Sequence, residues 1–335
     1  MSKMKMPLNK EWDMEELEYS LGLFDCGGIG VGTPNLTWDV FNGKWIVITA
    51  VGHSDLSDLA NLVGTFKPTY HLYAPAIFRM IPPKNDLGPI EKTFLQQTLF
   101  WDYCVPCVRN LWLCDDPENV TYSENYWSSC KKTRDEMESM GSWDGVRKIF
   151  AIKPYWVIQL LDCWPRRELI KEILPNYEML HLVRDGFRVI LDRQINGWDR
   201  GYDYMMPCPV TADYVRIKHG AVAPWFIEEE AMENWADYSG LTRSAHVWRV
   251  QVENTDFHVR YEDMIETPEK VAQYILDRFN VEWTEITDKV IEKIKNDPWR
   301  RSNHEITLNK PQILEDIQEP ERSKFKKQVE RLGYF

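Results

Sequence analysis

Apolar runs of strand length alternate with amphipathic segments along the chain. Residues 44–51 (KWIVITAV) are apolar almost throughout, which is typical of a strand buried on both faces of a sheet. The residues that follow, from about Ser54 to Thr65, have the apolar spacing of an amphipathic helix. The same succession recurs in the second half of the chain. The predicted strands are residues 44–51, 146–152, 178–183, 245–250 and 257–261.

Helical periodicity separates these strands. The predicted helices are residues 54–65, 155–174 with an interruption near Pro165, 187–196, a stretch near 225–238, and 268–279. Residues 66–145 are predicted to be irregular, with helical patches at 90–103 and 125–140. Because strands that alternate with helices form parallel sheets, the pattern predicts an α/β fold. Its central parallel sheet is flanked by helices in a three-layer sandwich.

The length of 335 residues suits a single domain over residues 1–335. Its expected parts are a lead-in at 1–40, aromatic-rich insertions at 66–145 and 198–244, and a charged helical tail at 285–335. The chain contains 15 Trp and 15 Tyr, a density that suits either a substrate pocket or extra core volume. In parallel sheets, ligands bind at the carboxyl ends of the strands, so the chemistry is expected there.

The charge balance excludes some classes of partner. Forty Lys and Arg against 52 Asp and Glu give a net charge of −12, which repels nucleic acids and anionic membranes. No run approaches the length of a membrane span, and residues 1–20 lack the apolar core of a signal peptide. The sequence therefore predicts a cytoplasmic protein without nucleic-acid or membrane partners, in which any anion site is a local basic pocket.

Several familiar motifs are absent or incomplete. Seven cysteines are an odd number, which favours reduced thiols over a disulfide framework, and the Cys104–Cys107 pair lacks the setting of a redox or zinc motif. The glycines in residues 26–34 (CGGIGVGTP) run into Thr-Pro instead of a helix, so a loop or hairpin is favoured over a dinucleotide site. No Gly-x-x-x-x-Gly-Lys-Ser/Thr run exists, which argues against a kinase of the P-loop class.

Four segments together resemble the sulfotransferases that use 3′-phosphoadenosine 5′-phosphosulfate. Residues 181–194 (HLVRDGFRVILDRQ) resemble that family's strand, Arg-Asp-Pro and helix, and residues 259–283 (VRYEDMIETPEKVAQYILDRFNVEW) resemble its Tyr-Glu-Asp segment. Residues 53–59 (HSDLSDL) stand where its Arg-Ser-Gly-Thr-Thr-Leu-Leu loop belongs. Residues 151–154 (AIKP) resemble its Lys-Ser/Thr-Pro element, which precedes a helix ending near residues 174–176. The resemblance implies a sulfotransferase-like, P-loop-like fold over about residues 45–285.

The resemblance also implies roles for particular residues. The donor would be held by His53, Ser54, Asp55, Leu56, Ser57, Asp58, Arg184, Asp192, Arg193, Arg300 and Arg301. Sulfuryl transfer needs a base and a cation, for which the candidates are His53, His71 and Lys153. The acceptor would lie among Trp101, Tyr103, Trp198 and Trp225. His181 is expected in the core, and the Tyr261-Glu262-Asp263 cluster is expected to brace the sheet edge without reacting.

The chain departs from the family pattern at both phosphate sites. In the first loop, the family's glycine is replaced by Asp55 and its two threonines by Leu56 and Ser57. At the second site, the serine eight residues after the arginine is replaced by Asp192. Ser54, Asp55 and Asp58 also suit a helix that caps its own N-terminus without a ligand. Alternatively, backbone N–H groups still bind an anion while the aspartates point outward, and Asp192 pairs with Arg193 or Arg188.

Three functions remain open on the sequence. The leading hypothesis is a sulfotransferase that acts on a hydroxyl or amine of a small acceptor, without a metal. The alternative is a protein that keeps the fold but has lost the donor, and that serves as a binding or assembly protein. A third is another transferase or lyase with a metal held by Asp55, Asp58 and Asp192. The sequence does not identify the acceptor, the pathway or the oligomeric state.

Overall fold

The centre of the structure is a five-stranded parallel sheet with the strand order β2-β3-β1-β4-β7. The computed structural model describes residues 43–51, 56–66, 69–72, 88–99, 155–195, 215–218, 221–224, 226–255, 257–297 and 307–335. The strands are β1 (Lys44–Ala50), β2 (Thr69–Leu72), β3 (Tyr155–Leu161), β4 (Tyr177–Val183) and β7 (His258–Arg260). The predicted α/β fold with a central parallel sheet is confirmed.

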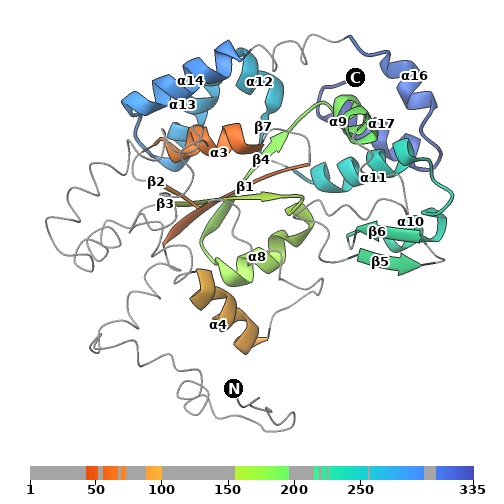
Figure 1. Ribbon diagram of the computed structural model, residues 1–335, viewed down its shortest axis with the longest axis horizontal. Helices are drawn as coiled ribbons and strands as arrows, with labels where there is room; N and C mark the ends of the chain where they lie inside the picture. Colours follow the sequence, from red (N-terminus) through yellow and green to blue (C-terminus); the bar gives the residue numbers. More distant parts are fainter. Residues whose placement is uncertain are drawn as a thin grey trace, which may run out of the picture.

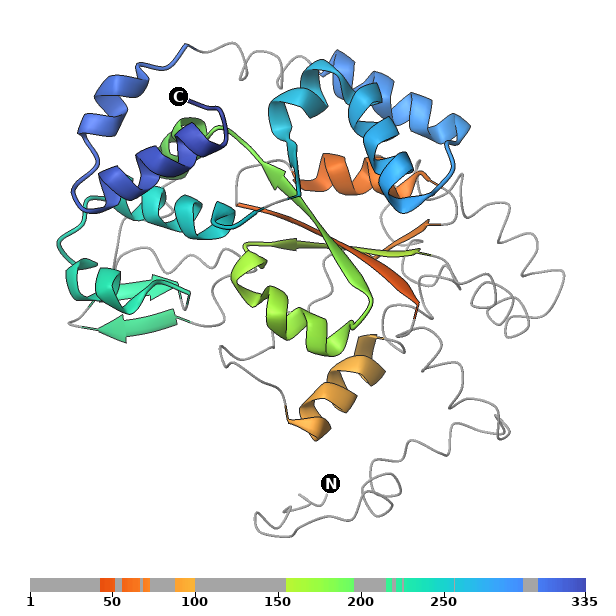
Figure 2. The ribbon, with the colours of Figure 1, turned by 180° about the vertical axis from the view of Figure 1, so that it is seen from behind.

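Helices cover both faces of this sheet (Figures 1 and 2). On one face lie α3 (Leu56–Gly64), α12 (Tyr261–Glu266), α13 (Pro268–Phe279) and α14 (Glu285–Asn296). On the other face, η3 (Trp164–Arg166) and α8 (Arg167–Ile173) connect β3 to β4, and α4 (Pro89–Thr98) packs beside α8. Within the described part of the chain, no helix is long and apolar enough to cross a membrane.

A further group of elements lies beyond the carboxyl end of β4. The group comprises α9 (Gly186–Ile195), β5 (Val215–Lys218), β6 (Ala221–Pro224), α10 (Glu229–Asn234), α11 (Gly240–Val252), α16 (Lys310–Glu315) and α17 (Glu321–Arg331). Of these, α11 packs against both α9 and α17, while β5 and β6 form a separate antiparallel pair.

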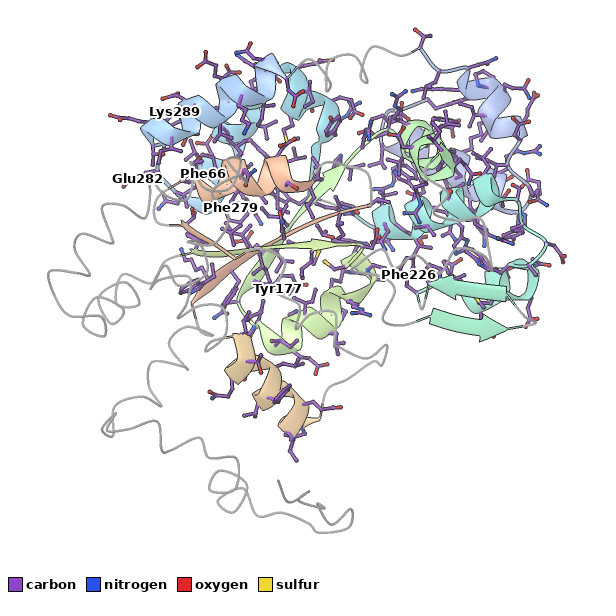
Figure 3. The ribbon with its side chains drawn as sticks, in the orientation of Figure 1. Phe66, Tyr177, Phe226, Phe279, Glu282 and Lys289 are labelled. Carbon is purple, nitrogen blue, oxygen red and sulfur yellow. The ribbon has the colours of Figure 1, made fainter. Side chains whose placement is uncertain are left out.

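The apolar run of residues 44–51 follows from the position of β1 in the middle of the sheet. Ile46 and Ile48 point to the α3 side, in a buried cluster with Phe66 and Phe279. Figure 3 shows these two phenylalanines together on that side of the sheet. On the other side, the alternate residues Trp45 and Val47 of β1 are buried as well. Both faces of β1 are therefore buried, as in an inner strand of a parallel sheet.

Two predicted elements are of the wrong type. Residues 155–161, predicted as the start of a helix, form β3, and α8 begins only after Pro165. Residues 245–250, predicted as a strand, lie inside α11, which begins where the Ser239 side chain accepts from the Thr242 N–H at 3.1 Å. Both segments are buried on nearly every side, and a continuously apolar run does not reveal its period.

Most of the other predicted strands and helices that fall within the described residues are confirmed. The strands near 44–51, 178–183 and 257–261 and the helices near 54–65, 187–196 and 268–279 are confirmed, as is the helical tail. Strand β2 lies in the segment predicted to be irregular, and the β5–β6 pair lies in the aromatic-rich insertion at 198–244. The expected strand at 146–152 and the helical patch at 125–140 lie outside the described residues. The single domain stays a prediction.

Candidate functional site at the carboxyl edge of the sheet

The strand register brings the ends of three neighbouring strands to one level. Ala50 at the end of β1 pairs with Leu161 of β3 on one side and with Leu182 of β4 on the other. Arg260 of β7 pairs with Val183, the next residue of β4. The chain leaves β1 toward β2 and β3 on one side and returns to β4 on the other, so β1 marks the topological switch point. Ligands of open α/β sheets bind in the crevice at such a point.

Helix α3 follows β1 and carries the first predicted phosphate element. His53, Ser54 and Asp55 lie outside the described residues. Ser57 is exposed, but Asp58 is buried in the first turn of α3, with 7% of its surface accessible. Asp58 therefore does not meet the condition of the alternative in which the aspartates point outward. Its carboxylate lies in the first turn of α3, where the helix dipole stabilises a negative charge without a ligand.

The second predicted phosphate element is occupied by an internal carboxylate. Arg184, directly after β4, has a side chain that is 6% exposed, and its Nη1 lies 3.0 Å from Oδ2 of Asp192. The other oxygen, Oδ1, lies 3.7 Å from Nε of Arg188, one helical turn earlier. The predicted pairing of Asp192 with Arg188 is confirmed, and Arg184 joins it. Arg193 lies on the buried face of α9 with Val189 and Ile190.

Aromatic and backbone contacts fix the position of Arg184. Its guanidinium lies over the Tyr261 ring, 4.9 Å from the centroid, and its backbone carbonyl accepts from the Trp248 indole N–H at 3.2 Å. The Glu262 carboxylate accepts the Asp185 N–H at 3.0 Å. Tyr261 and Glu262 therefore brace the strand end, as the sequence predicted.

The last residues of the chain extend this brace. The Tyr334 hydroxyl lies 2.8 Å from the Glu262 carboxylate and 3.1 Å from the Val183 carbonyl. Burial, followed by the charge of Glu262, raises the pKa of the Tyr334 hydroxyl, so the phenol stays protonated and can donate. Lys310 forms an ion pair with Asp185 at 2.8 Å. Sequence reasoning missed both contacts, because residues 310 and 334 are far from the motif in the chain and nothing in the local pattern marks them.

The position of β3 removes the argument that placed Lys153 at the site. Lys153 lies outside the described residues, and it was placed at a strand's carboxyl end on the assumption that a helix starts at Tyr155. Because β3 occupies 155–161, the proline that precedes the helix ending at Ile173 is Pro165. The family's lysine position, two residues before that proline, then corresponds to Cys163.

Cys163 does not replace a lysine chemically. It is buried, and burial raises the pKa of its thiol to about 12, so the thiol is neutral near pH 7. Sequence reasoning predicted reduced thiols, and the Cys163 thiol is free. The cation that follows is Arg166, which is 8% exposed and whose charge acts on the Cys163 thiol.

His181 and His71 are the described histidines for which the sequence predicted a position or a role. His181 is fully buried in β4, where burial and then neighbouring His258 lower its pKa to about 3, so the expected core position is confirmed. His71 is the third of the four residues of β2, and its backbone pairs with that of Val157 in β3. Its role stays a prediction.

The remaining predicted site residues lie outside the described part of the chain. They are Trp101, Tyr103, Lys153, Trp198, Trp225, Arg300 and Arg301, together with His53, Ser54 and Asp55. Among the described residues, no group of three or more His, Cys, Asp or Glu side chains could hold a metal ion. Since Asp55 is not among them, the metal alternative is untested.

The chain is similar, at low sequence identity, to solved sulfotransferase structures. The sulfotransferase domain of the Synechococcus PCC 7002 olefin synthase has 12% identity and a TM-score of 0.46, covering 87% of this chain and 95% of that one. The sulfotransferase domain of the curacin biosynthetic pathway has 13% identity and a TM-score of 0.40, covering 87% and 97%. STF9 from Mycobacterium avium has 11% identity and a TM-score of 0.40, covering 88% and 78%. No curated protein matches the chain.

The sequence profile described as "Sulfotransferase family" matches residues 68–285. The matched region runs from β2 to the start of α14 and contains β3, β4, β7 and the Arg184 junction. It begins after β1 and α3, so the degenerate first loop lies outside it. Because the match covers well over half of the sequence, the chain belongs to the sulfotransferase family.

Proposed function

We propose that the protein transfers a sulfuryl group from an adenosine phosphosulfate to a hydroxyl or amine of a small acceptor. The observation that carries the proposal is the register of β1 and β4, because it sets the start of α3 and Arg184 at one edge of the sheet, on adjacent strands. Neighbouring strands lie about 4.8 Å apart, so one nucleotide could reach both elements. The family's donor is 3′-phosphoadenosine 5′-phosphosulfate.

The proposal assigns the 5′ side of the donor to α3. Backbone N–H groups at a helix start attract anions without needing the family's glycine and threonines, although the buried Asp58 in the first turn of α3 opposes that attraction. Arg184 would face the ribose. His53 and His71 remain the candidate bases. Arg166 replaces Lys153 as the candidate cation, because it follows the carboxyl end of β3, whereas residue 153 precedes this strand. The four predicted tryptophan and tyrosine residues would hold the acceptor.

Calorimetric titration with adenosine 5′-phosphosulfate and with 3′-phosphoadenosine 5′-phosphosulfate tests this proposal. We expect at least one donor to bind with a micromolar Kd, and the Arg184→Ala variant to lose that binding. Arg278→Ala is the matched control, because Arg278 of α13 forms an exposed ion pair with Glu178 of β4. If neither donor binds the folded protein at millimolar concentration, sulfuryl transfer from these donors is ruled out.

A specific observation supports a second candidate function. The ion pair between Arg184 and Asp192 neutralises the arginine on which donor binding depends, as expected of a family member that keeps the fold as a binding or assembly protein. That candidate predicts no donor binding by the wild type. It also predicts that Arg184→Ala changes stability alone.

A further inference from the structure

Arg184 already holds an anion, the carboxylate of Asp192, at the second phosphate element. We propose that Asp192 takes the place of a ligand phosphate, so that this edge of the sheet binds an adenine nucleotide whose ribose 3′-hydroxyl is free. Adenosine 5′-phosphosulfate and adenosine 5′-monophosphate belong to this class. The inference rests on the proposed function, and it specifies the donor.

The charges at the site disfavour a second phosphate. Two guanidinium groups, of Arg184 and Arg188, face one carboxylate at 3.0 and 3.7 Å. A phosphate on the same arginines would approach the Asp192 carboxylate within about 4 Å. For one unit charge, that repulsion weakens binding about 5-fold in a water-like medium and about 1,000-fold at an effective dielectric constant near 20.

The same carboxylate suits a hydroxyl. An ionised carboxylate only accepts hydrogen bonds, so it attracts the O–H of a ribose hydroxyl and repels the negatively charged oxygens of a phosphate. The Asp192 side chain is 23% exposed, whereas Arg184 behind it is 6% exposed. A ligand approaching from solvent therefore meets the carboxylate before the guanidinium. In dinucleotide-binding folds, an acidic side chain likewise selects a free ribose hydroxyl where an arginine accepts a phosphate.

The surrounding contacts hold the pair in place. Arg184 lies over the Tyr261 ring and its backbone is bonded to Trp248, while Asp192 lies on α9 and is paired at i,i+4 with Arg188. Moving Asp192 away would break both ion pairs at once. The carboxylate is thus a fixed part of the site.

Two nucleotides that differ only in the 3′-phosphate test the inference. Adenosine 5′-monophosphate and adenosine 3′,5′-bisphosphate are titrated into the wild type, Asp192→Ser and Asp192→Asn. We expect the wild type to bind the monophosphate about tenfold or more tightly than the bisphosphate. Both variants should reverse this preference by gaining affinity for the bisphosphate. Asparagine has nearly the same shape as aspartate, so the Asp192→Asn variant provides the test if the Asp192→Ser variant does not fold.

The control and the opposing outcomes separate this inference from the proposed function. Asp277→Ser removes an acid of α13 that contacts Gln273, and it should leave both affinities unchanged. If the wild type binds the bisphosphate as tightly as the monophosphate, the inference is wrong while the proposed function stands. If only the Asp192 variants bind a nucleotide, the ligand class is wrong. If no folded form binds either nucleotide, the proposed function fails as well.

Discussion

His181 makes the stability of the protein depend on pH. Its ring is fully buried in β4, with Nδ1 3.2 Å from the Thr255 hydroxyl and the Trp164 ring at 5.2 Å. Burial and then His258 lower its pKa to about 3, whereas an unfolded histidine titrates near about 6.5. The unfolded chain therefore binds a proton that the folded protein rejects. The stabilising contribution is complete above pH 6.5 and is lost as the pH falls toward 3.

The free energy of unfolding should fall by up to about 1.4 kcal/mol per pH unit for this one group. Burial also lowers the pKa of His258, which adds to the effect in the same direction. Urea unfolding between pH 7 and pH 5 measures the slope. His181→Asn keeps a polar atom near Nδ1 but does not titrate, so it should flatten the slope. An unchanged slope in this variant would contradict the assignment.

Gly186 is required by the close approach of Trp248. A Cβ at this position would lie 2.9 Å from the Trp248 ring, and that indole is fully buried while its N–H donates to Arg184. Gly186→Ala should therefore lower the free energy of unfolding by about 1–3 kcal/mol, measured by chemical denaturation. Gly88→Ala is the control, since its methyl group meets only the end of the Glu91 side chain at 3.3 Å. Equal stability of the two variants would refute the argument.

The same contact explains a departure from the family pattern. The family's Arg-Asp-Pro has a proline where this chain has Gly186, and a proline would bring a Cβ against Trp248.

At the residue scale, the resemblance predicted that Arg184 lies at a strand end, and the charges of nearby residues predicted that Asp192 pairs with an arginine. The sequence could not reveal the contacts of Trp248, Lys310 and Tyr334 with this strand end, because contacts between residues that are distant in the chain leave no local pattern.

At the element scale, buried ion pairs attach α17 to α11. Glu321 of α17 is 2% exposed, and its carboxylate lies 2.7 Å from Nε of Arg249 and 2.8 Å from Nδ1 of His246. Arg249 also pairs with Glu228 and Glu253. The cluster thus joins α17 and α11 to Glu228, which precedes α10, and to Glu253, which follows α11.

Removing one member of such a cluster leaves other buried charges short of a partner. Glu321→Ala should lower the free energy of unfolding by about 3 kcal/mol, measured by chemical denaturation. Glu269→Ala breaks an exposed ion pair with Lys295 and should cost less than about 1 kcal/mol. Similar losses in the two variants would show that the buried cluster contributes no more than a surface pair.

The elements that sequence reasoning found were those with a clear period or clear ends. Helix α13 has apolar spacing and begins at Pro268, and β1 has the apolar run of an inner strand. For β3, the missed signal was Pro165, which follows a seven-residue apolar strand and starts the turn into α8. In α11, burial on nearly every side hid the helical period, and only the Ser239 cap marked its start.

At the scale of the whole molecule, Tyr334 connects the end of the chain to the candidate site. Its hydroxyl contacts Glu262, whose other oxygen accepts the Asp185 N–H. Tyr334→Phe keeps the ring but removes the hydroxyl, so we expect a loss of about 1–2 kcal/mol and faster hydrogen exchange at residues 183–187. Exchange measured by mass spectrometry tests this. Tyr274→Phe, at an exposed tyrosine, is the control, and equal exchange in both variants would contradict the brace.

The parallel sheet could be predicted from the alternation of strands and helices, since that inference needs only local patterns. The strand order and the identity of the helices beyond β4 could not, because they depend on which distant segments pack together. The position of Arg184 was predicted because the resemblance places it directly after a strand, where the structure has it. The proposed acceptor residues 101, 103, 198 and 225 lie outside the described residues.

The bond between Tyr334 and Val183 also bears on the order in which the protein forms during synthesis. The two residues are 151 positions apart, and a ribosome adds about 5–20 residues per second. The strand end that carries Arg184 must therefore wait about 8–30 s for its last partner to be made. Until then, this end of β4 lacks the Tyr334 contact, and incompletely folded chains are prone to aggregate. A translational pause between residues 183 and 334 would lengthen that interval.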